Sequence, residues 1–425
     1  MERAVVRKLT LRLVPFLFFL YIVAYLDRIN VGFAMLQMQE QLGFTDKVFG
    51  LGLAIFFVGY FCLQVPSNLV LERVGARRWI AVLMVVWGVV SASMLLVRGP
   101  RSFYALRFLL GAAEAGFFPG VIFYLKSWFP AGARARTVAR FMTAAPLSGV
   151  IGGPISGALL GWHLKGGLAG WQWMFLMEGI PAILLGAVVV FYLVDGPEKA
   201  RWLSDGERSW LLETLRAERN QAVASSSLFS ALAEPRIWML ALVYFGLNTA
   251  SYGVTLWLPK MIQTVSTAGN LGVGFLSAIP YLAAAVSMVV VGLHSDRTGE
   301  RRWHAALPAF AGACALAGAA YSTSTDSSIF LLSVALLGVF SMMGPFWSMP
   351  TSLLSGTAAA AGIAFINSIG NLGGFAGPFA IGLVRSSTGQ FTGGLLLVGA
   401  ALAMSGVVVL LVQFGQVRTP LHPQD

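Results

Sequence analysis

Four charged residues lie deep inside apolar stretches of this sequence. Asp27 and Arg28 are adjacent within FFLYIVAYLDRINVGFAML, and Arg107 and Glu114 stand within RFLLGAAEAGFFPG. A charge at the centre of a membrane helix costs at least about 2.5–3.5 kcal/mol, so such residues usually mark ion or substrate pathways. Carboxyl groups can take up protons, and arginines bind carboxylates through two parallel hydrogen bonds. The chemistry to expect is coupled binding of protons and an anion.

The protonation state of the two acids decides the charge of this cluster. With both carboxyls ionised the four charges cancel, and with both protonated the cluster carries two positive charges that suit a carboxylate. We interpret Asp27 and Arg28 as a switchable pair, Arg107 as a second anion-binding residue, and Glu114, about 20 Å below the outer edge, as a deeper proton-coupling residue. A static ion pair that locks two membrane helices together is the competing interpretation.

The remaining candidates for chemistry are few. Glu178 lies near the outer end of an apolar segment beside Trp171 and Trp173, a position that predicts a cap at the membrane interface. No nucleophile with a base and no metal-ligand set occurs in the apolar segments, so we expect no enzyme, no metal and no cofactor other than protons as coupling ions.

The elements that position these charges follow from composition. Hydrophobic residues make up 57% of the chain and charged residues only 11%, against about 25% charged in soluble proteins. Twelve apolar runs of about 20 residues, each long enough to cross a membrane, lie six on each side of one polar stretch. We predict an all-α membrane protein of twelve transmembrane helices in two six-helix bundles, residues 1–195 and 237–425, joined by a linker, 196–236, that contains an amphipathic surface helix.

Orientation follows from the basic residues. Most Lys and Arg residues fall in the N-terminal segment, the linker and alternate loops, which places both termini in the cytoplasm. We therefore expect a multi-pass protein of the cell membrane, in bacteria the inner membrane. The net charge of +11 reflects this topology and contact with membrane lipid, not nucleic-acid binding. We expect a monomer.

The two halves carry an internal repeat. ERVGARRW at 72–79 returns as DRTGERRW at 296–303, an offset of 224 residues, and the same offset aligns SGVIGGP with GGFAGP. Adding 224 to the positions of the four buried charges gives uncharged residues in the second half. We therefore expect the second half to supply uncharged groups to a shared cavity. Candidates from both halves for contact with the substrate are Tyr21, Tyr25, Asn30, Asn248, Ser251, Tyr252, Trp347, Asn367 and Asn371.

These motifs, together with VPSNLVLERVGARRW and WQWMFLMEGIPA, resemble the major facilitator superfamily and, within it, the anion:cation symporter family. Asn68 departs from the glycine that usually opens the signature loop. The resemblance implies alternating access and import of a small organic anion, such as a sugar acid, tartrate or a related carboxylate, with protons. Charged residues of the two repeated loops are interpreted as conformational latches that tie helix ends together in the outward-facing state: Glu72, Arg73, Arg77, Asp296, Arg297 and Arg301.

Other functions remain open. An organic-anion or organophosphate exchanger needs the arginines but not the acids Asp27 and Glu114. Drug–proton efflux fits poorly, because two cavity arginines would repel cationic drugs. A transporter-like sensor would need a signalling domain or a long tail, and the ends of this chain are short. An enzyme is the least favoured class.

Overall fold

The computed structural model describes residues 2–162, 167–221, 234–353 and 356–412. The first half contains α1 (Glu2–Leu42), α2 (Asp46–Val74), α3 (Ala76–Ser93), η1 (Met94–Leu96), α4 (Pro100–Glu114), α5 (Phe117–Trp128), α6 (Ala131–Met142), α7 (Ala144–Leu160) and α8 (Gly170–Tyr192). Between the halves lie η2 (Pro197–Lys199) and α9 (Asp205–Gln221). The second half contains α11 (Pro235–Val265), α12 (Asn270–Thr298), α13 (Arg302–Ala319), α14 (Thr325–Leu353), α15 (Gly356–Thr388) and α16 (Thr392–Leu411).

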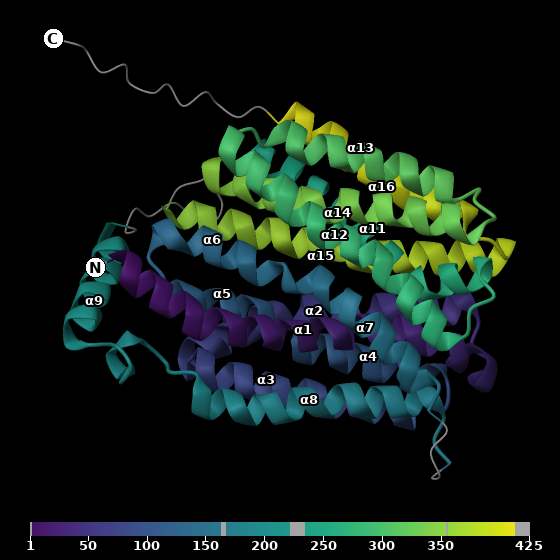
Figure 1. Ribbon diagram of the computed structural model, residues 1–425, viewed down its shortest axis with the longest axis horizontal. Coiled ribbons are helices and arrows are strands. Elements are labelled where there is room, and N and C mark those ends of the chain that lie inside the picture. The colour runs from purple at the N-terminus through teal and green to yellow at the C-terminus, as the bar shows by residue number, and fades with distance from the viewer. Residues whose placement is uncertain (1, 163–166, 222–233, 354–355, 413–425) are drawn as a thin grey trace.

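The helices run roughly along the long axis of the molecule and form two bundles, one above the other in the view of Figure 1. One bundle holds α1–α8 and the other α11–α16, and α9 lies at the same end as the N-terminus. Within the described residues, ten helical segments are long and apolar enough to cross a membrane. The ninth and eleventh predicted spans coincide with α13 and α15. The prediction of an all-α membrane protein is confirmed.

Two of the predicted spans are interrupted by short breaks that prolines explain. Proline has no backbone N–H, so it cannot donate to the carbonyl four residues earlier, and its ring crowds that carbonyl. Pro119 follows the break between α4 and α5, and Pro146 follows the break between α6 and α7. As a result Glu114 is the last residue of α4, beside the break.

Close helix crossings join the bundles. A Cβ atom on Gly153 of α7 would lie 2.5 Å from the carbonyl oxygen of Gly274 on α12, and one on Gly50 of α2 would lie 2.8 Å from the Cα atom of Gly382 on α15. Only residues without a side chain permit such approach. With the offset of 224 residues, α2 of the first half corresponds to α12 of the second, and α7 corresponds to α15. The α7–α12 and α2–α15 crossings are therefore equivalent contacts related by the repeat.

These crossings lie at the end of the molecule opposite the N-terminus. At that end Arg385 of α15 forms an ion pair with Asp46 of α2, with Nη1 and Oδ1 2.6 Å apart, and Gln39 donates to the same carboxylate oxygen at 2.6 Å. With the termini in the cytoplasm, as the sequence predicts, the bundles are closed on the outer side. The space between them then faces the cytoplasm.

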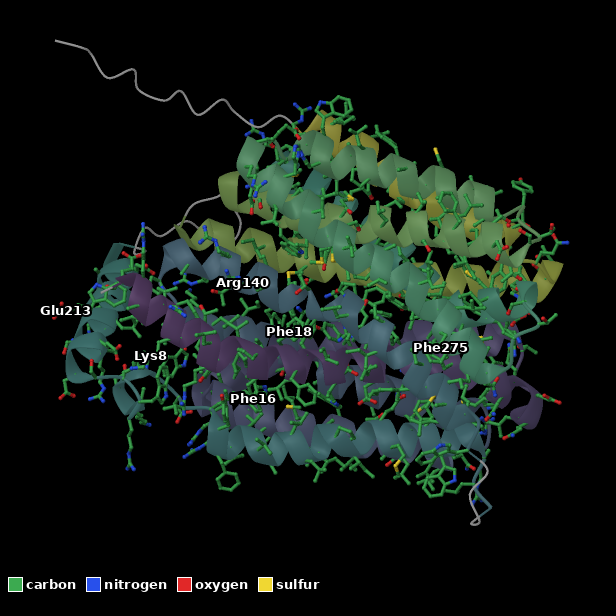
Figure 2. All side chains as sticks on the ribbon, viewed as in Figure 1. Lys8, Phe16, Phe18, Arg140, Glu213 and Phe275 are labelled. Carbon is green, nitrogen blue, oxygen red and sulfur yellow. The ribbon has the colours of Figure 1, made fainter. Side chains whose placement is uncertain are left out.

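The linker helix packs on the first bundle. Lys8 of α1 forms an ion pair with Glu207 at 2.7 Å, and Leu211 on α9 is fully buried. Just before α9, the ring of Trp202 stacks on Trp128 with centroids 5.5 Å apart. Figure 2 shows Lys8 at the α1 end next to α9, whereas Glu213 lies on the opposite side of α9.

Candidate functional site

The central feature of the site is a buried ion pair between α1 and α4. Arg28 donates from Nη2 to Oε2 of Glu114 at 2.8 Å and from Nε to the same oxygen at 3.2 Å. The Glu114 side chain is 1% exposed and that of Arg28 is 11% exposed. The other guanidinium nitrogen, Nη1, donates to the hydroxyl of Tyr252 on α11 at 3.1 Å. Arg28 therefore connects an acid of the first bundle to a hydroxyl of the second.

The repeat explains why Arg28 meets Tyr252. The two residues stand 224 positions apart, so each occupies the position of the other in its own half. Residues that approach a twofold axis contact their own counterparts across it. The pair therefore marks the point where the two halves face each other at the centre of the molecule.

The expected pairing of Asp27 with Arg28 is corrected by the structure. Asp27 is fully buried, but its carboxylate accepts hydrogen bonds from Ser91 on α3 and, at 3.3 Å, from Asn30 one turn along α1. Successive helix residues point about 100° apart around the axis. Arg28 can thus face the interface between the bundles while Asp27 faces the interior of the first bundle, and the carboxyl partner of Arg28 is Glu114.

Arg107 lies behind this pair. Its side chain is fully buried, and Nε donates to the carbonyl oxygen of Gly52 at 3.2 Å, whereas Nη1 and Nη2 have no hydrogen-bond partner. The ring of Phe56 contacts both arginines, with its centroid 4.8 Å from Cζ of Arg107 and 5.3 Å from Cζ of Arg28. Arg107 does not line the cavity in this conformation, and its role in anion binding stays a prediction.

A cavity between the bundles collects most of the other predicted residues. Nine of the expected substrate contacts line it: Tyr21, Tyr25, Arg28, Asn248, Ser251, Tyr252, Trp347, Asn367 and Asn371. Asn30, also expected, does not line it. The second bundle contributes amides, hydroxyls and aromatic rings, as the repeat predicts. The Asn248 amide donates to the carbonyl oxygen of Gly370 at 3.0 Å, which fixes its orientation.

The sequence did not single out the aromatic and apolar part of the lining. These residues are Tyr60, Phe118, Met142, Ala145, Tyr244, Phe340 and Met343. Such side chains are frequent throughout membrane helices, so their type carries no signal. Only the rotation of each helix shows which of them face the cavity.

Glu178 is also placed differently from the expectation. It is 7% exposed and accepts a hydrogen bond from Ser156 on α7, with Oγ and Oε1 2.7 Å apart. It therefore lies inside the first bundle and does not cap the membrane interface. Its neighbour Trp171 is likewise buried and donates to Gln41 at 2.8 Å.

The predicted latch residues make contacts within their own halves. Arg77 lies 3.4 Å from Asp195 and donates to the carbonyl oxygen of Val190 at 3.3 Å. In the second half, Arg301 pairs with Asp296 at 2.6 Å. Glu72, Arg73 and Arg297 are exposed. A latch between helix ends in another conformation stays a prediction.

The geometry supports a defined chemistry. A proton on Glu114 removes the negative charge that holds Arg28, and the freed guanidinium then faces a cavity rich in hydroxyls and amides. A small carboxylate with hydroxyl groups matches both kinds of partner. The described residues contain no group of three or more His, Cys, Asp or Glu side chains suited to hold a metal ion.

Sequence comparison places this arrangement among known proteins. The family model of the Major Facilitator Superfamily matches residues 17–378. A putative tartrate transporter from Agrobacterium vitis is 54% identical over 413 residues, covering 97% of this chain and 95% of that protein. A quinolone resistance transporter from Acinetobacter baumannii is 40% identical over 414 residues, with coverage of 97% and 95%.

Structure comparison gives the same fold. A bacterial homolog of the human lysosomal transporter Spinster, in an inward-facing and occupied conformation, superposes with a TM-score of 0.75 at 16% identity, covering 94% of this chain and 95% of that one. The family match, the relatives and the helical architecture make this protein a multi-pass membrane transporter and not an enzyme. The chain belongs to the major facilitator superfamily.

Proposed function

We propose that this transporter is a proton-coupled symporter that imports a small organic anion, such as tartrate or a sugar acid, across the bacterial inner membrane by alternating access. The observation that carries the proposal is the bond of Arg28 to both Glu114 and Tyr252. Protonation of Glu114 frees the guanidinium for an anion. Binding of the anion in turn favours the protonated acid, because the two negative groups compete for one cation.

The rest of the cavity supports a hydroxylated anion or one with a second carboxylate. Asn367, Asn371 and Ser251 of the second bundle line the same cavity as Arg28, so they can bind hydroxyls or a second carboxylate while Arg28 binds the first. A relative named as a putative tartrate transporter over almost the whole chain supports this class of substrate.

A second candidate is drug efflux. The cavity contains several aromatic rings, among them Tyr21, Phe118 and Trp347, and one relative is named a quinolone resistance transporter. Such a function would use the aromatic walls to bind a flat ring and would move it outward in exchange for protons.

The test is transport by the purified protein in proteoliposomes with an imposed pH gradient. The panel contains tartrate, sugar acids, dicarboxylates, aromatic acids and a quinolone, and a pH-sensitive dye inside the vesicles follows protons. We expect a hydroxylated carboxylate to accumulate when the outside is acidic, together with protons. Exchange of anions without accumulation would identify an exchanger, and proton-driven movement of the quinolone in the opposite direction would identify drug efflux.

A further inference from the structure

A second group of buried polar residues lies inside the first bundle, apart from the Arg28–Glu114 pair. It consists of Asp27 and Asn30 on α1, Ser91 on α3, Ser156 on α7 and Glu178 on α8. All five are at most 7% exposed. Four helices, α1, α3, α7 and α8, therefore contribute buried polar side chains around two carboxyl groups.

No basic side chain of the described residues forms an ion pair with either carboxyl. Arg28 is engaged by Glu114 and Tyr252. Arg107 and Glu114, both from α4, interact with Asp27 through space, while α3 and α7 present only serine hydroxyls to the pair. Two unpaired buried carboxylates would be very costly, so one of them must hold a proton.

The number of hydrogen-bond donors favours Glu178 over Asp27 as the protonated acid. The Asn30 amide nitrogen and the Ser91 hydroxyl both donate to Oδ1 of Asp27, so this carboxyl receives two donors, although its Oδ2 is buried without a partner. Glu178 receives a single donor, from Ser156 to Oε1. Its other oxygen, Oε2, and the amide oxygen of Asn30 are both buried without a partner.

A proton on Oε2 would give this buried oxygen a hydrogen to donate. Asn30 lies beside the Glu178 carboxyl, and a proton on Oε2 can be donated to the amide oxygen of Asn30. Buried polar atoms of native proteins are almost always hydrogen-bonded.

We propose that Glu178 is a second proton-binding residue of the transporter, linked through Asn30 to Asp27 and separate from the Arg28–Glu114 pair. Its proton comes from water and returns to water, and its loss leaves a carboxylate next to that of Asp27. The two acids of this group therefore titrate as a coupled pair. The proposal deepens the proposed proton coupling and rests on it for its role in transport, but the presence of the proton can be tested without transport.

Infrared spectroscopy detects this proton directly. A buried protonated carboxyl has a C=O stretch separate from those of carboxylates and amides. In the purified protein at neutral pH, we expect such a band in the wild type and its loss in Glu178→Gln. Glutamine suits the site, because its amide can still donate to Asn30 and accept from Ser156. Glu213→Gln, an exposed acid on α9, is the matched control and should leave the band unchanged.

Asn30→Leu provides an independent test that keeps Glu178 in place. Removing the acceptor should move the carboxyl band to higher frequency, because the O–H group loses its partner. A band that persists in Glu178→Gln, or that is lost only in Asp27→Asn, would overturn the proposal, as would an Asn30→Leu spectrum identical to that of the wild type.

Transport then gives the functional consequence. We expect Glu178→Gln to bind the anion with wild-type affinity but to carry one proton fewer per anion, measured from reversal potentials in proteoliposomes. An unchanged ratio would remove Glu178 from the transport cycle. If the infrared band is present and the protein shows no proton-driven uptake at all, the proposed symport fails while the proton site stands.

Discussion

At the scale of residues, the chemistry of the site depends on which acid binds Arg28. Arg28 places two nitrogens on one Glu114 oxygen and the third on Tyr252, so every guanidinium nitrogen is engaged. Asp27 is bound by Ser91 and Asn30 instead. The anion and the protein therefore compete for one guanidinium, and the state of Glu114 decides the outcome.

Replacement of Arg28 should abolish anion binding. An alanine removes the cation, and lysine restores the charge but cannot contact Glu114 and Tyr252 with separate planar nitrogens. Loss of a buried charged partner costs about 2 kcal/mol or more, so we expect affinity to fall at least about 30-fold in Arg28→Ala, with poor rescue in Arg28→Lys. Isothermal titration with the transported anion measures this. Unchanged affinity in Arg28→Ala would remove Arg28 from the binding site.

Glu114→Gln should separate exchange from accumulation. Glutamine imitates the protonated acid, so Arg28 stays free to bind the anion but no proton can be released. We expect uptake driven by a pH gradient to fall by about 100-fold, the order of effect for a lost proton-transfer group, while exchange between equal pools continues. Radiolabelled substrate in proteoliposomes measures both. Continued concentration of substrate by Glu114→Gln would favour the static ion-pair interpretation.

At the scale of elements, a helix break and a docked linker position the functional parts. The break after Glu114 lets α4 end at the acid that Arg28 binds. The α9 helix is attached to the first bundle through Lys8 and, further along, through the ion pair of Arg134 with Glu218 at 3.1 Å. These two ion pairs tie α9 to the first bundle and not to the second.

The attachment of α9 to the first bundle should weaken at acid pH. The hydrogen bond from Lys8 lowers the pKa of Glu207 below its usual range. A lowered pKa stabilises the docked state above the unfolded-state pKa, and this contribution is lost as the pH falls through the lower, folded-state value. At neutral pH we expect faster hydrogen exchange across α9 in Glu207→Gln than in the wild type, with the difference disappearing in acid. Glu213→Gln should match the wild type, and equal exchange in all three proteins would contradict this role.

At the scale of the whole molecule, the repeat produces two equivalent crossings that close one end. The α7–α12 and α2–α15 contacts both need glycine at the point of closest approach. The Asp46–Arg385 ion pair lies at the same end, with side chains 19% and 12% exposed. Closure at this end leaves the cavity facing the end that carries the termini.

Breaking the Asp46–Arg385 pair should favour opening of that end. A partly exposed ion pair contributes up to about 1 kcal/mol, so Asp46→Asn should raise the outward-open population about fivefold. Spin labels at the outer ends of α7 and α12 report the change as a longer distance. The exchanged pair, Asp46→Arg with Arg385→Asp, should restore closure, and Asp326→Asn, an exposed acid in the first turn of α14, is the control. An unchanged distance in Asp46→Asn would show that the glycine crossings alone hold this end closed.

Several properties of this transporter follow from the sequence alone. Hydropathy is a local property and the penalty for a membrane charge is large, so the apolar spans, the central linker and the buried charges Asp27, Arg28, Arg107 and Glu114 are readable without a structure. The repeat can be detected because the loops at 72–79 and 296–303 have similar residues. Most of the cavity lining predicted from polar residue types is also found in the structure.

The pairing of those charges was decided only by tertiary structure. Whether Arg28 meets Asp27 or Glu114 depends on how α1 and α4 are rotated about their axes, and hydropathy does not specify rotation within an apolar helix. Glu178 illustrates the same limit, because its position near a helix end predicts an interface while packing against α1 and α7 buries it. The closed outer end likewise arises from contacts between residues hundreds of positions apart, which no local pattern encodes.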